Sequence, residues 1–189
     1  MDLTTWIVEE LDDMTSRLES SVIGIVPVER HKERVDGGGS TITSLLWHLA
    51  RHQDIAVNRV IADRGEILDD HRSSTGATGL AAAAGLEEAE SQEITDQLDP
   101  DGVVEYYRAV CAATASLLPD LTADQLNAVP DSSARLAAAG VAESEVPWLY
   151  RMWDGKPASF HIRWEAIGHG VTHTGEMVSM RNRMGLSPF

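Results

Sequence analysis

The stretch Gly168-His169-Gly170-Val171-Thr172-His173-Thr174-Gly175-Glu176 decides the fold expected of this chain. It lies inside the last long helical pattern, and its two histidines are four residues apart. On a helix, this spacing separates two side chains by about 40° around the axis and about 6 Å along it. Both imidazoles can therefore bind one metal ion from a single helix face. The other ligands must come from a different element.

The best candidate for a third ligand is His48, in the segment Leu45-Leu46-Trp47-His48-Leu49-Ala50-Arg51-His52. His48 and His52 are also four residues apart, so spacing alone does not choose between them. The segment around His169 is not a zincin motif, because Gly170 stands where that motif has a glutamate base. The sequence predicts a metal site of three histidines.

Two glutamates lie close to the expected ligands along the chain. Glu165 comes one turn before His169, and Glu176 comes three residues after His173. Each could orient a ligand imidazole from behind or act as a general base. A surface carboxylate is an equally good interpretation of either residue. Glycines beside both histidines predict the close approach of a neighbouring helix or a ligand, because glycine weakens a helix interior.

Apolar residues that recur at intervals of three and four predict four long helices. They run from about Leu3 to Ile25, from Ser40 or Thr41 to Ala62, from Asp99-Pro100 to Pro119, and from Ala158 to Met184. Thr122-Ala123-Asp124-Gln125 is a capping box that predicts a short helix. The segments 63–79 and 130–157 are expected to be irregular, and 80–97 is equally compatible with a short helix or a solvated acidic face. The pattern predicts an all-α four-helix bundle with long crossover connections.

Composition limits the classes of protein that this chain can represent. Its 189 residues, 43% of them apolar, are expected to form a single domain, 1–189. A formal charge of −15 argues against nucleic-acid binding. No apolar run is long enough to span a bilayer, and early charged residues argue against a signal peptide. One cysteine, Cys111, cannot form an internal disulfide, so we expect a cytoplasmic protein without a membrane partner.

The motifs Trp47-His48-Leu49-Ala50 and His169-x-x-x-His173-Thr-Gly-Glu make the chain resemble the DinB/YfiT-like superfamily of four-helix proteins. This superfamily includes the N-terminal domain of mycothiol-dependent maleylpyruvate isomerase. The resemblance implies a divalent metal, commonly zinc or nickel, bound by His48, His169 and His173. The family usually continues with Arg-Gly-Gln after the second histidine of the pair, whereas this chain has Thr174-Gly175-Glu176 and keeps only the glycine.

The resemblance also implies a function. Characterised branches transfer or isomerise with mycothiol or bacillithiol, so the leading hypothesis is a metal-dependent thiol S-transferase acting on a small electrophile. Arg51, Arg59 or Arg163 could contact an acidic substrate. The alternatives are a metal-assisted hydrolase with Glu165 or Glu176 as base, and a bundle that binds a metal or small ligand without catalysis. A homodimer is plausible from the family, and the aromatic segment 148–153 is expected to fold over the site.

Overall fold

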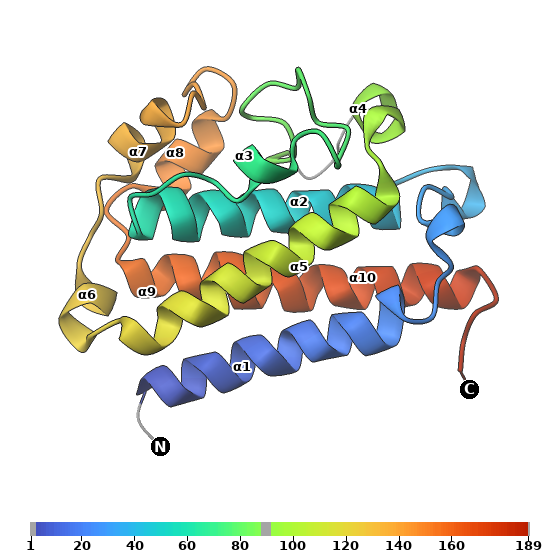
Figure 1. Ribbon diagram of the computed structural model, residues 1–189, viewed down its shortest axis with the longest axis horizontal. Coiled ribbons are helices and arrows are strands. Elements are labelled where there is room, and N and C mark those ends of the chain that lie inside the picture. The colour runs from blue at the N-terminus through green and yellow to red at the C-terminus, as the bar shows by residue number, and fades with distance from the viewer. Residues whose placement is uncertain (1–2, 88–91, 189) are drawn as a thin grey trace.

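The computed structural model describes residues 3–87 and 92–188, and within these ranges it contains helices and loops but no strand (Figure 1). The all-α prediction is confirmed. No helix of the described chain is long and apolar enough to cross a membrane. The four long helices are α1 (Leu3–Leu18) with η1 (Glu19–Ile23), α2 (Ile42–Asp54) with η4 (Ile55–Ile61), α5 (Pro100–Leu117), and a last helix made of α9 (Ala158–His161), η6 (Ile162–Gly168) and α10 (His169–Arg183).

The starts of these helices follow local capping rules. The Thr41 side chain accepts a hydrogen bond from the Ser44 backbone N–H, and the Ser44 side chain reciprocates. Asp99 caps α5 in the same way, with Pro100 in the first turn. The η1, η4 and η6 segments are π-helical continuations, so each long helix keeps its direction beyond its α-helical part. The predicted long helices are therefore correct to within a few residues.

Helix α2 is buried along its whole length. Its apolar side chains Leu45 and Leu49 lie in the largest hydrophobic core, together with Tyr106 and Val110 of α5. The crossover that connects α2 to α5 runs alongside α2 (Figure 1), and the polar side chains of His48 and Arg51 contact it there. α2 is thus the central helix of the molecule rather than one wall of a symmetrical bundle.

Buried polar contacts hold this crossover on α2. Arg51 forms a buried ion pair with Glu66 and donates hydrogen bonds to the carbonyl oxygens of Ala82 at 2.8 Å and Ala84 at 3.2 Å. The Asp54 carboxylate accepts hydrogen bonds from two backbone N–H groups of the crossover, each at 3.0 Å. A buried charge without partners is very unfavourable, so these contacts fix the path of the crossover.

The segments expected to be irregular contain short helices, so that prediction is wrong in part. Residues 63–79 include α3 (Leu68–His71), and residues 130–157 include α7 (Ser132–Ala138) and α8 (Pro147–Trp153). Asp131 caps α7, and Pro147 occupies the first turn of α8. Of the stretch 80–97, residues 92–97 form α4 (Gln92–Gln97), and residues 88–91 lie outside the described part. The remaining short helices are η2 (Val28–Arg30), η3 (Val35–Gly37), η5 (Leu118–Asp120) and α6 (Ala123–Asn127).

The glycines of the last helix do not share one explanation. A Cβ atom at Gly170 would lie 2.6 Å from the Met14 sulfur of α1, so α1 approaches closely there, as predicted. A Cβ atom at Gly175 would meet no atom within 4 Å, so close approach does not explain that position. The pair Gly170 and Met14 sets the distance at which α1 packs against the last helix.

His161 is a fully buried histidine whose two ring nitrogens have no hydrogen-bond partner in the described residues. Its ring meets the edge of Trp153, with 5.0 Å between the ring centroids. Burial lowers the pKa of His161 from 6.5 to about 4. The folded protein therefore keeps this ring neutral at a pH where an unfolded chain would protonate it.

The free energy of unfolding is expected to fall as the pH drops from about 6.5 to about 4. In this range His161 binds a proton in the unfolded state but not in the folded state. One such group contributes a slope of about 1.4 kcal/mol per pH unit. The test is chemical denaturation of the wild type and His161→Phe between pH 7 and about 4. His161→Phe should show the shallower pH dependence. Equal slopes for the two proteins would contradict the assignment.

Candidate metal centre

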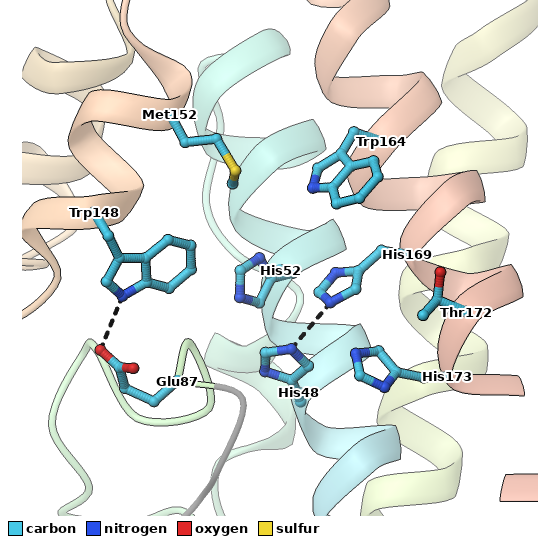
Figure 2. Close-up of a pocket in the computed structure, with 9 residues that line it drawn as sticks. All are labelled: His48, His52, Glu87, Trp148, Met152, Trp164, His169, Thr172 and His173. Carbon is cyan, nitrogen blue, oxygen red and sulfur yellow. Dashed lines mark hydrogen bonds between the residues drawn. The ribbon is translucent and has the colours of Figure 1, made fainter. Parts of the chain in front are cut away.

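Three histidines from two helices converge in the middle of the bundle (Figure 2). His48 lies on α2, whereas His169 and His173 lie one turn apart on α10. One potential ligand atom of each ring lies within 4.8 Å of those of the other two. The Nε2 atoms of His48 and His169 are only 3.0 Å apart. The structure thus brings together the three residues predicted to bind metal.

The other nitrogen of each ring faces an oxygen atom. His48 Nδ1 lies 2.7 Å from the Gly85 carbonyl oxygen, and His173 Nδ1 lies 2.9 Å from the Glu176 carboxylate. His169 Nδ1 lies 3.5 Å from Glu165 Oε2. When the Nδ1–H of an imidazole faces an oxygen, its Nε2 carries the free lone pair that binds a metal. The Nδ1 contacts therefore make the Nε2 atoms the expected ligand atoms, and those of His48 and His169 already lie 3.0 Å apart.

His52 occupies a different position, although its spacing made it equivalent to His48. Its Nδ1 lies 2.9 Å from Glu165 Oε2, and its Nε2 lies 2.9 Å from the Leu86 carbonyl oxygen. His52, Glu165 and His169 do form a second group with metal-ligand distances. Both nitrogens of His52 are already engaged with oxygen atoms, however, so the geometry favours His48 as the ligand from α2.

Glu165 and Glu176 stand behind the ligand rings. The Glu165 side chain is fully buried, and one of its oxygens accepts a 2.6 Å hydrogen bond from the Trp153 indole. Burial alone would raise the pKa of Glu165, but its contacts with the His169 and His52 rings lower it to about 2. Glu176 is 43% exposed. Neither glutamate lines the pocket that opens at the histidines.

Two of the ligand rings, His48 and His169, have pKa values that favour the neutral form that a metal binds. Burial, reinforced by the nearby His52 and His169, lowers the pKa of His48 to about 2. Burial also lowers the pKa of His169, although the Glu165 carboxylate partly opposes that effect. A metal ion binds neutral imidazole, so protons compete weakly for these two rings at neutral pH.

A sequence profile described as the DinB superfamily matches residues 10–177. The chain belongs to the DinB superfamily. Proteins of this superfamily typically bind a metal ion, and the buried histidine and glutamate groups of this member could hold one. A solved structure described as a conserved protein from Enterococcus faecalis shares this DinB fold. It has a TM-score of 0.67, is 21% identical, and the match covers 98% of this chain and 99% of that chain. Among curated proteins, none matches the chain.

A pocket of about 430 Å³ opens above the histidines of this DinB protein (Figure 2). Such a volume is typical of small-molecule sites. Of the aromatic segment 148–153, Trp148 and Met152 line the pocket, whereas Trp153 is fully buried beneath it. The lining consists of His48, His52, Glu87, Trp148, Met152, Trp164, His169, Thr172 and His173.

Three of these lining residues, Glu87, Trp164 and Thr172, were not predicted from the sequence. The three arginines that were suggested as substrate contacts do not line the pocket. Thr172 and Trp164 lie on the ligand helix near His173 and His169, and that proximity was the only signal for them in the sequence. Arg51 is buried against Glu66, the Arg59 guanidinium donates to two backbone carbonyls, and Arg163 lies elsewhere.

Proposed function

We propose that His48, His169 and His173 bind one divalent metal ion, zinc or nickel, and that the protein transfers a low-molecular-weight thiol such as mycothiol to a small electrophile. The observation that carries the proposal is the convergence of one ring nitrogen each from His48, His169 and His173, all within 4.8 Å of one another at the pocket, while the Nδ1 atom of each ring faces an oxygen atom. An ion held by three neutral imidazoles supplies an open coordination position and lowers the pKa of a thiol bound there.

The protein's own groups would orient the ligand rings. Glu176 and the Gly85 carbonyl face the Nδ1 atoms of His173 and His48 at hydrogen-bond distance, and Glu165 lies 3.5 Å from the Nδ1 atom of His169. Trp148, Met152 and Trp164 form apolar walls beside the histidines. A thiol and an electrophile that bind in the pocket would therefore lie between apolar walls beside the histidines.

The positions of Glu165 and Glu176, the two glutamates suggested as bases, favour thiol transfer over hydrolysis, because neither lines the pocket. Metal-assisted hydrolysis needs a base that accepts a proton from water. Glu165 is enclosed by its hydrogen bonds to Trp153 and His52, and its pKa of about 2 makes it a weak base. Glu176 lies behind His173, outside the pocket lining. A thiolate is itself the nucleophile and requires no such group.

Metal content tests the proposal directly. The wild type and the His48→Ala, His169→Ala and His173→Ala variants are stripped with a chelator, reloaded with zinc or nickel, and analysed for bound metal. We expect one ion per wild-type chain and an affinity loss in each variant that exceeds the about 10- to 100-fold typical of an outer partner. His71→Ala, a histidine outside the pocket, is the matched control and should keep the ion.

Activity is then measured with mycothiol and a panel of electrophiles. A rate that depends on the metal, and that the three histidine variants lose, is the expected result. Stoichiometric metal without transfer to any electrophile would favour a metal-binding bundle that is not an enzyme. A wild-type protein that takes up no metal after reloading would refute the metal site itself.

A further inference from the structure

Two indole rings stand beside the histidines at the pocket (Figure 2). Trp148 of α8 stacks on His52, with 6.0 Å between the ring centroids and 24° between the planes. Trp164 of η6 is nearly parallel to His169, at 6.3 Å and 6°. Two flat apolar rings from different elements therefore border one opening.

Trp164 is unusually exposed for a large aromatic side chain. Its side chain is 43% exposed, although it belongs to a well-packed helix and lines the pocket. Trp148 is held in place, because its indole N–H donates a 2.9 Å hydrogen bond to the Glu87 carboxylate. An exposed aromatic wall in a concave site is typical of a surface that a ligand covers.

Among the described residues that line the pocket there is no permanently positive side chain. None of its nine lining residues is lysine or arginine, and the one acidic residue at its edge is Glu87. Proteins usually recognise carboxylates with arginine or lysine. Arg51, the arginine nearest in sequence to His48, is buried in its ion pair with Glu66. The formal charge of the whole chain, −15, also disfavours the approach of anions.

Two indole rings border the pocket, and none of its lining residues is lysine or arginine. We therefore propose that the pocket selects an uncharged, planar aromatic electrophile, which lies against Trp148 and Trp164, and rejects carboxylates. The preference for an uncharged ring rests on the proposed function only in taking this pocket as the substrate site, whereas the role of that ring as an electrophile also rests on thiol transfer. In the transfer, the thiol sulfur forms a bond to an aromatic carbon, the leaving group departs with the electrons of its bond, and the thiol proton passes to solvent.

A matched pair of unreactive ligands isolates the effect of charge. 1,3-Dinitrobenzene is uncharged, and 3,5-dinitrobenzoate is the same ring with a carboxylate. Calorimetry measures the binding of each to the full chain, both loaded with zinc and free of metal. In the metal-free protein, where no ion attracts the carboxylate, we expect the uncharged ring to bind at least about tenfold more tightly.

Three tryptophan variants locate the binding surface. Trp164→Ala should weaken dinitrobenzene binding about three- to tenfold, whereas Trp164→Phe, which keeps a ring, should retain most of the affinity. Trp6→Ala is the control, because Trp6 is similarly exposed, at 47%, but does not line this pocket. Equal binding of the two ligands by the metal-free protein, no binding of either, or unchanged affinity in Trp164→Ala would overturn the proposal.

The outcomes for the metal and for the ring are separable. A protein that binds no metal but prefers dinitrobenzene in a Trp164-dependent way would refute the proposed function and support the inference. A protein that loses its metal in the three histidine variants but binds the carboxylate equally well when metal-free would support the metal site and refute the inference.

Discussion

In the Glu165→Ala variant, we expect metal affinity to fall about 10- to 100-fold and the metal-free protein to lose several kcal/mol of unfolding free energy. The first effect arises because Glu165 faces Nδ1 of His169 at 3.5 Å. The second arises because Trp153 and His52 lose the acceptor that they share in a fully buried space. The measurements are metal titration and denaturant unfolding of the metal-free protein.

Glu176→Ala is the matched comparison for Glu165→Ala. Glu176 also holds a ligand ring, at 2.9 Å from His173 Nδ1, but its side chain is 43% exposed. Water can replace that carboxylate, so metal affinity should fall while the unfolding free energy changes by less than about 1 kcal/mol. If Glu165→Ala bound metal as tightly as the wild type, the outer-partner role of Glu165 would be wrong.

The Gly85→Ala variant should be destabilised by about 3 kcal/mol or more and should also bind metal weakly. Gly85 has φ +88°, a backbone conformation that disfavours every residue with a Cβ atom. The new methyl group would lie 2.5 Å from Trp47 Nε1 and 2.6 Å from Arg51 Cγ. Moving this turn would displace the carbonyl that holds His48 at 2.7 Å.

Gly79→Ala separates the two causes of that effect. Gly79 has nearly the same backbone angle, φ +87°, but a Cβ atom there would meet nothing within 4 Å. It should therefore show only the backbone cost, about 1–2 kcal/mol, and normal metal affinity. Equal destabilisation of the two variants would show that packing around Gly85 is unimportant.

The four long helices were predictable because their determinants are local. Apolar periodicity defines the packed face, and the side chains of Thr41, Asp99 and Thr122 mark helix starts as predicted. The helices α7 and α8 were not predicted, because their short apolar patterns gain stability from packing on η4 and on each other rather than from propensity.

The three histidine ligands could be predicted only in part from the sequence pattern. Spacing brought His169 and His173 together, but it could not choose between His48 and His52. That difference depends on the carbonyl oxygens of Gly85 and Leu86, which the crossover brings from more than thirty residues away. No local pattern contains this information, and only the family resemblance pointed to His48.

Trp164 could not be predicted as a pocket residue for a different reason. It precedes His169 by five residues, a spacing that points away from the ligand face of an ordinary α-helix. Residues Ile162–Gly168 are π-helical, with hydrogen bonds between residues five apart and more residues per turn than an α-helix, and this brings the Trp164 ring nearly parallel to the His169 ring. Hydrophobic periodicity assumes 3.6 residues per turn, so it does not find such a residue.

The dependence of the site on the crossover has a consequence for protein design. Grafting three histidines onto a plain four-helix scaffold would reproduce the ligand atoms but not the carbonyl that fixes the His48 ring. The transplanted imidazole would rotate freely, and the engineered centre would bind metal weakly and with little selectivity. A successful graft would have to include residues 82–86 of the crossover and Arg51, which binds that segment, together with the histidines. The smallest unit that can be transplanted is therefore α2 with the crossover segment that packs on it.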